Sequence, residues 1–185
     1  MRIIAGKFKG KKLSEFELAT TRPTSDLIRG AIFDTIGFDI IDANFLDMFA
    51  GTGACGIEAL SRNAKTCVFV DQNKQAVNVI KKNLNSVGNS TSPVLNQSFE
   101  KAIETLSQQN IKFDFVFLDP PYASDFAEQA IKILINKKLL SKDAVIIWEH
   151  DKSKQNYILQ NFEQFKQKKY GDKFVSYINL TDVER

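Results

Sequence analysis

The sequence predicts an α/β fold, a mostly parallel sheet with helices on both faces that ends in an antiparallel hairpin. From about residue 44 onward, short apolar runs alternate with amphipathic helical patterns, and strand–helix alternation of this kind builds a parallel sheet covered on both sides. Near the C-terminus, two strand-like runs instead flank Gly171-Asp172, a dipeptide typical of tight hairpin turns. The first 40 residues differ from the rest by their basic character. We therefore expect an N-terminal extension at 1–40 and a sheet domain at 41–185.

The N-terminal extension is predicted to contain a small hairpin and one helix. The stretch "MRIIAGKFKGKKL" is expected to turn near Lys9-Gly10, and Ser25–Ile36 carries apolar residues on one side of a helix. Met1–Lys12 holds five basic residues and no acidic one. This charge fits either a solvated surface or a surface that contacts a polyanion such as a nucleic acid.

Five short apolar runs that follow are predicted to be strands. Most have several apolar residues in succession, so they have no solvated face and fit the centre of a parallel sheet. Between them, apolar positions recur three and four residues apart in Asn73–Val87, with Asn73 as the N-cap, and in Ser124–Asn136. The five predicted strands are Phe45–Ala50, Thr66–Asp71, Ser92–Gln97, Phe113–Asp119 and Asp143–Glu149. The hairpin strands are expected at Gln164–Tyr170 and Lys173–Leu180.

Composition and length indicate one soluble globular domain with a small appendage. The chain has 185 residues, of which 43% are hydrophobic and 25% charged, and a net charge of +3. No apolar run approaches the roughly 18 residues of a membrane-spanning helix, and the N-terminus does not have the pattern of a signal peptide. Cys55 and Cys67 have neither metal-site nor redox spacing. We therefore expect a cytoplasmic protein with no membrane contact and no metal, and we expect a monomer.

A glycine-rich loop directly after the first predicted strand has the spacing of a nucleotide site. Gly51, Gly53 and Gly56 form a G-x-G-x-x-G pattern, in which glycines serve a tight turn, close approach of a ligand and close helix–strand packing. Asp71 ends the second predicted strand 20 residues after Gly51, where an acid can accept hydrogen bonds from both ribose hydroxyls. Together they predict a site for a dinucleotide or another adenosyl compound, and the loop does not decide between these ligands.

The sequence "DPPY" stands at the end of the fourth predicted strand, which lies beside the first in the usual doubly wound order. The prolines fix the backbone, so Asp119 and Tyr122 keep a set separation. The Asp119 carboxylate and the Pro120 carbonyl can together accept both hydrogens of an amino group, and the Tyr122 ring can stack on a flat heterocycle. The motif therefore predicts a receptor for a base that carries an amino group.

Taken together, these motifs resemble those of one protein family. "DPPY" is similar to the catalytic motif of S-adenosylmethionine-dependent methyltransferases that act on exocyclic amino groups of bases. "LDMFAGTGACGIEALSR", "RPTSDLIRGAIFDTI" and "MRIIAGKFKGKKL" resemble the cofactor loop, the preceding helical motif and the opening hairpin of the RsmD-type 16S ribosomal-RNA guanine-N2 methyltransferases of bacteria. The likeness spans nearly the whole chain. It implies a Rossmann-like class I methyltransferase fold: a seven-stranded, mostly parallel sheet with a C-terminal antiparallel hairpin and a small N-terminal extension.

The resemblance also implies a reaction, a cofactor and a partner. The chain would transfer a methyl group from S-adenosylmethionine to the N2 amine of a guanine in 16S ribosomal RNA, free or in the small ribosomal subunit. The residues implied to be catalytic are Asp119, Pro120, Pro121 and Tyr122. Those implied to bind the cofactor are Asp47, Phe49, Gly51, Gly53, Asp71, Gln72, Ser98, Phe99 and Asp119. Those implied to bind RNA are Arg2, Lys7, Lys9, Lys11, Lys12, Arg22, Thr24 and Arg29.

One position departs from the pattern of related enzymes, and two other functions stay open. Many methyltransferases carry an acid after the third strand, near the adenine amino group, where this chain has Ser98 and Phe99. Phe99 could line the adenine face or simply start a helix. A DNA methyltransferase acting on adenine N6 or cytosine N4 would use the same four-residue motif, but little chain remains for a separate target-recognition domain. A nicotinamide oxidoreductase or a non-catalytic nucleotide-binding module would leave "DPPY" without a role.

Overall fold

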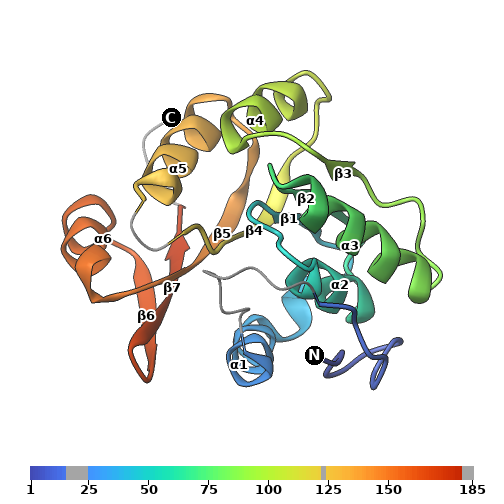
Figure 1. Ribbon diagram of the computed structural model, residues 1–185. Coiled ribbons are helices and arrows are strands. Elements are labelled where there is room, and N and C mark those ends of the chain that lie inside the picture. The colour runs from blue at the N-terminus through green and yellow to red at the C-terminus, as the bar shows by residue number, and fades with distance from the viewer. Residues whose placement is uncertain (16–24, 122–123, 181–185) are drawn as a thin grey trace.

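The computed structural model describes residues 1–15, 25–121 and 124–180, in which seven strands form one sheet (Figure 1). The strands are β1 (Asn44–Asp47), β2 (Thr66–Val70), β3 (Val94–Leu95), β4 (Phe113–Leu118), β5 (Leu140–His150), β6 (Phe165–Tyr170) and β7 (Lys173–Asn179). Their order across the sheet is β3-β2-β1-β4-β5-β7-β6. Neighbours among β1 to β5 run parallel, whereas β7 runs antiparallel to both β5 and β6. The predicted fold class is confirmed, including the C-terminal antiparallel hairpin.

Several strands differ in length from the predicted runs. β2 ends at Val70 and β4 at Leu118, so Asp71 and Asp119 each follow a strand directly and lie in loops. β3 has only two residues because polar residues and a proline make up the rest of its predicted range, and it lies at one edge of the sheet. β5 begins three residues earlier than predicted, at Leu140, which pairs with the first residue of β4.

The described residues also form six α-helices and two short 3-10 helices, of which the first two precede β1. They are α1 (Asp26–Ile36), η1 (Gly37–Ile40), α2 (Ala54–Ser61), α3 (Lys74–Ser86), α4 (Phe99–Ser107), α5 (Phe126–Asn136), η2 (Lys152–Lys154) and α6 (Gln155–Asn161). Ser25 caps α1 and Asn73 caps α3, each through a side-chain oxygen that accepts a backbone N–H, and the predicted starts are confirmed. α5 begins two residues after Ser124, because the Ser124 hydroxyl and N–H both bond to the Pro121 carbonyl in a turn, at 2.7 and 3.0 Å. None of the described helices is long and apolar enough to cross a membrane.

The sheet divides the core into two apolar layers. α1, α2 and α3 form the α1–α3 layer on one face, and α4, α5 and α6 form the α4–α6 layer on the other (Figure 1). Successive residues of the central strands alternate between the two: Phe117 and Ile147 lie in the α1–α3 layer, whereas Leu118 and Trp148 lie in the α4–α6 layer. Because both faces are covered at the centre of the sheet, β4 and β5 each carry a run of consecutive apolar residues, at 115–118 and 144–148.

Residues 1–15 form a hairpin-like loop against the α1–α3 layer. Arg2 and Lys12 form an antiparallel bridge, and the Ile3 N–H donates to the Lys11 carbonyl at 3.0 Å. Ile3 and Leu13 are each 2% exposed and belong to the same core cluster as the sheet. The predicted N-terminal hairpin is confirmed, while the domain boundary at residue 40 stays a prediction.

Candidate functional site

The glycine loop joins β1 to α2 at the C-terminal edge of the parallel strands. Gly51 and Gly53 have φ values of 55° and 76°, in the left-handed region that favours glycine. Gly56 lies in α2, where a Cβ would come within 2.5 Å of the Cys67 sulfur on β2. The tight turn and the close helix–strand packing expected of these glycines are therefore both present. Cys55, in the first turn of α2, and Cys67 are free thiols, and both are buried.

Two carboxylates accept hydrogen bonds from the backbone of this loop. Asp71 accepts from the Gly51 N–H through Oδ2 and from the Asn73 N–H through Oδ1, both at 2.8 Å, and partial burial raises its pKa despite these bonds. Asp47 is 1% exposed and accepts from the Gly56 N–H at 2.9 Å, and burial raises its pKa to about 7. Within the described residues, Oδ1 of Asp47 has no hydrogen-bond partner. A buried acceptor without a partner beside a glycine loop fits a ligand that brings a donor.

Gln72 follows Asp71 and is exposed. The Asn96 side-chain amide donates to the carbonyls of both residues, at 3.0 and 3.1 Å. This contact joins the loop after β2 to the loop after β3, and both loops carry residues predicted to bind the cofactor. Asn96 itself was not predicted from the sequence.

An aromatic cluster lies between the loop after β1 and the helices of the α4–α6 layer. The ring centroids of Phe49, Phe99 and Phe126 are 5.8, 6.5 and 5.3 Å apart in the three pairs. Phe99 begins α4, and Ser98 caps that helix through its hydroxyl. Phe99 therefore starts a helix and also contacts Phe49, so the two roles considered for it are compatible. Contact of these rings with adenine stays a prediction, and Phe126 was not among the residues predicted to bind the cofactor.

The "DPPY" motif follows β4 at the same edge of the sheet as the glycine loop. β1 pairs with β4 in parallel, and the Met48 N–H just after β1 donates to the Phe117 carbonyl at 3.1 Å. Asp119 is half-buried, Pro120 is buried and Pro121 is exposed. Tyr122 lies outside the described residues. The structure thus brings the acid and the prolines beside the glycine loop.

Most of the basic residues predicted to bind RNA lie on the surface of the hairpin. Those that are exposed are Arg2, Lys7, Lys9, Lys11 and Lys12. Two of these side chains are already engaged: Arg2 Nη1 donates to the Gly10 carbonyl at 3.1 Å and Lys11 Nζ donates to the Ser86 carbonyl at 3.0 Å. Arg22 and Thr24 lie outside the described residues.

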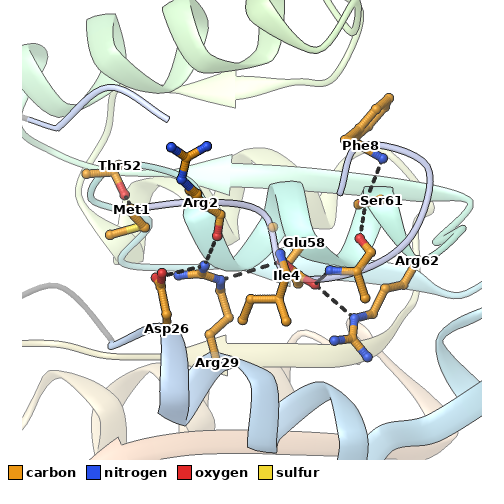
Figure 2. A network of polar contacts seen from close by, with 12 residues as sticks. Met1, Arg2, Ile4, Phe8, Asp26, Arg29, Thr52, Glu58, Ser61 and Arg62 are labelled. Carbon is orange, nitrogen blue, oxygen red and sulfur yellow. Dashed lines mark hydrogen bonds and ion pairs between the residues drawn. The ribbon is translucent and has the colours of Figure 1, made fainter. Parts of the chain in front are cut away.

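The prediction that Arg29 binds RNA is wrong, because its side chain is fully buried and cannot contact RNA phosphates. Figure 2 shows the polar network that surrounds it. Its guanidinium donates to the Arg2 carbonyl and to Asp26, and its Nε lies 3.7 Å from the Glu58 carboxylate. Glu58, also fully buried, accepts from the Ile4 N–H at 2.8 Å. Arg29 therefore has a structural role, joining α1 to the hairpin and to α2.

Asn83 connects the hairpin to the glycine loop. Its amide nitrogen donates to the Thr52 carbonyl at 2.9 Å and to the Ser14 carbonyl at 3.0 Å, and its amide oxygen accepts from the Ser14 N–H at 2.8 Å. Sequence reasoning missed this residue. Its signal was a polar side chain three residues after Ile80, on the apolar side of a helix.

Nearly the whole chain matches one family of proteins. The family model described as "Conserved hypothetical protein 95" matches residues 1–179. The chain is 38% identical over 181 residues to ribosomal RNA small subunit methyltransferase D of Haemophilus influenzae, covering 96% of this chain and 91% of that protein. "Putative methyltransferase yhhF" from Escherichia coli has the same fold, with a TM-score of 0.82 and 29% identity over 97% of each chain.

A more distant structure shows the same fold. It is the 16S rRNA N2 G1207 methyltransferase of T. thermophilus, solved in complex with AdoMet and guanosine, with a TM-score of 0.71 and 20% identity over 89% of this chain and 44% of that one. The family match and the relative in Haemophilus influenzae extend over both the hairpin and the sheet. The chain therefore belongs to the Conserved hypothetical protein 95 family, and the RsmD-type family resemblance of its motifs is confirmed.

Proposed function

We propose that this chain transfers a methyl group from S-adenosylmethionine to the exocyclic N2 amine of a guanine in 16S ribosomal RNA. The observation that carries the proposal is the parallel pairing of β1 with β4, which sets a glycine loop beside an Asp-Pro-Pro turn at one edge of the sheet. A glycine loop that binds an adenosyl cofactor, placed beside a receptor for an amine, suits the transfer of a group from the bound cofactor to the bound amine. The similarity to ribosomal RNA small subunit methyltransferase D supports RNA of the small subunit as the substrate.

The residues around the glycine loop fit an adenosyl cofactor. Bound S-adenosylmethionine would supply an electrophilic methyl group on a cationic sulfur. Asp71 would accept hydrogen bonds from the ribose hydroxyls. Asp47 has a buried oxygen without a partner in the described residues, which suits a donor on the cofactor. Phe49 and Phe99 would lie against the adenine ring.

The residues after β4 would hold the target amine. The Asp119 carboxylate and the Pro120 carbonyl would accept its two hydrogens and aim the nitrogen. The gain is mostly orientation, with reacting atoms held about 3–3.5 Å apart. Asp119 does not have to ionise the amine first, because the proton is lost more easily as the nitrogen becomes cationic. Tyr122 would stack on the unpaired base, a contact worth roughly 1–3 kcal/mol.

The exposed lysines of the hairpin would contact RNA phosphates. Neutralising Lys9 and Lys12 together should weaken RNA binding and flatten its dependence on salt, while the affinity for the cofactor stays unchanged. Filter binding at several salt concentrations measures both effects. An unchanged RNA affinity and salt slope would assign these lysines to ordinary solvated surface.

Transfer of tritiated methyl groups tests the function. The substrates are 16S ribosomal RNA, undermethylated small subunits and DNA, and nucleoside analysis is expected to find N2-methylguanosine in RNA. Methylation of DNA alone, at adenine N6 or cytosine N4, would support a DNA methyltransferase. Tight binding of NAD without binding of S-adenosylmethionine would support a nicotinamide enzyme.

Variants of the "DPPY" motif test the roles of its residues. Asp119→Ala should abolish most transfer and leave cofactor binding near normal, because the lost orientation acts mainly in the transition state. Tyr122→Ala should weaken productive RNA binding, whereas Tyr122→Phe should keep most activity because the ring carries the effect. Near-full turnover by Asp119→Ala would remove the amine-acceptor role. Equal damage by both tyrosine variants would assign the effect to the hydroxyl.

A further inference from the structure

A buried ion pair lies beside the amine receptor at the C-terminal edge of the parallel strands. Leu118, the last residue of β4, pairs with Trp148 of β5 in parallel register, so Asp119 is the first residue after β4 and Glu149 is the next residue of β5. Leu118 and Trp148 both lie in the α4–α6 layer. Because side chains alternate along a strand, Glu149 faces the α1–α3 side, and Asp119 directly follows the last residue of β4. Glu149 therefore lies on the strand beside the one that Asp119 directly follows.

Only one oxygen of the Glu149 carboxylate is satisfied. The side chain is fully buried, and Oε1 pairs with the ammonium of Lys173, which begins β7. Oε2 has no hydrogen-bond partner anywhere in residues 1–15, 25–121 and 124–180. A buried carboxylate oxygen left unpaired is costly in a folded protein, and its place beside the amine receptor fits a donor that arrives with the substrate base.

The order of groups along this edge matches the Watson–Crick edge of guanine. That edge presents the N2 amine, then the N1–H donor, then the O6 acceptor. The sheet presents the Asp119 carboxylate after β4, the Glu149 carboxylate on β5 and the Lys173 ammonium on β7, and these three strands are neighbours in that order. Adenine has an acceptor at N1 and a donor at its 6-amino group, so it would place like groups against Glu149 and Lys173.

We propose that Glu149 and Lys173 determine the specificity for guanine, with Glu149 accepting the N1–H and Lys173 donating to O6. The inference rests on the proposed function, since it assigns the base that the same site takes. A site built to pair with polar groups of its substrate rejects an analogue without them, because its own buried groups then stay unpaired. The ion pair keeps acceptor and donor in contact, as N1–H and O6 are adjacent on the base.

Substitution of the target base tests this role. 2-Aminopurine keeps the N2 amine but lacks both the N1–H and O6. In 16S ribosomal RNA, free or in reconstituted subunits, it replaces the methylated guanine, whose position is mapped by mass spectrometry of ribonuclease fragments. Single-turnover transfer should be at least about 100-fold faster to guanine than to 2-aminopurine with the unaltered protein. Glu149→Gln and Lys173→Met should each narrow this ratio about tenfold or more by slowing transfer to guanine, with little change for 2-aminopurine.

Glu128→Gln is the matched control. Glu128 is also a buried carboxylate with one lysine partner, Lys154, and one oxygen without a partner in the described residues, but it lies on α5 in the other layer. This control should leave the ratio unchanged.

The outcomes separate the inference from the proposed function. Equal slowing with both bases by Glu149→Gln and Lys173→Met, in variants that bind the cofactor normally, would overturn the inference and make the ion pair structural. If Glu149→Gln does not fold, Lys173→Met decides by itself, because Lys173 is partly exposed. If the unaltered protein methylates no guanine in any ribosomal RNA substrate, the proposed function fails instead.

Discussion

Removal of the buried Glu58 carboxylate is expected to detach the N-terminal hairpin and to destabilise the whole fold. Glu58 accepts from the Ile4 and Ala5 N–H groups at 2.8 and 3.0 Å and from Arg62 Nε at 3.0 Å, and it pairs with Arg29 (Figure 2). Glu58→Met keeps the side-chain size but leaves the Arg29 guanidinium buried without this partner, which costs about 3–5 kcal/mol. Arg29→Met should cost less, about 1–3 kcal/mol, because Glu58 keeps Arg62 and both backbone donors.

Urea unfolding followed by circular dichroism measures these free energies of unfolding. The double variant should lose less stability than the sum of the single losses, by about 0.5–3 kcal/mol, because the two side chains share one interaction. Trypsin should also cleave at Lys7 or Lys9 faster in Glu58→Met, because the hairpin is no longer held on α2. Losses that add to within about 0.5 kcal/mol, together with an unchanged rate of cleavage, would refute the reasoning.

Three further predictions follow from the glycines and carboxylates of the fold. Gly6→Ala should release the hairpin from α2, because a Cβ at Gly6 would lie 1.9 Å from the Ser61 carbonyl oxygen. Gly10 has a similar φ but lies in open space, so Gly10→Ala should cost only about 1–2 kcal/mol of backbone strain. Equal melting temperatures of the two variants would contradict this prediction. Asp71→Ala should weaken S-adenosylmethionine binding by about 1.5–3 kcal/mol in calorimetry, and unchanged affinity would exclude Asp71 from the site. Asp47 in the native state keeps its proton up to about pH 7, while the unfolded chain loses it near 3.8, so the free energy of unfolding should fall as pH rises between these values, by about 1.4 kcal/mol per unit. Asp47→Asn should remove this slope in urea titrations at pH 5 and 7, and a constant difference between the two proteins would show that the carboxyl does not titrate there.

The fold could be predicted where burial dictates the sequence. The central strands are covered on both faces, so their uninterrupted apolar runs stand out and their order follows from the strand–helix alternation. The length of β3 was overestimated because this strand lies at an edge of the sheet, where two paired residues suffice and polar residues are tolerated. α6 is short, and of its seven residues only Ile158 is buried, so its apolar pattern was too weak to read.

Only those parts of the candidate site whose residues lie close together in the sequence could be predicted. The glycine loop and the Asp-Pro-Pro turn each fit within a few residues, so their spacing could be read directly. Arg29 was misread because its basic charge continues that of the hairpin, whereas its partner Glu58 lies 29 positions away on another helix. Asn83 and Glu149 depend in the same way on contacts across the fold, and no short pattern encodes those contacts.

The reactivity of the two buried thiols can be used to measure local opening of the fold. Burial raises the pKa of both Cys55 and Cys67 well above the ordinary value, so neither sulfur is a reactive thiolate in the closed state. An alkylating reagent can therefore modify each sulfur only in the moments when that part of the chain opens. Cys55 lies directly behind the glycine loop and Cys67 lies within β2. Mass spectrometry can follow the two alkylation rates separately, without any engineered label. The rate at Cys55 reports local opening at the glycine loop, and the rate at Cys67 reports opening of the sheet at β2.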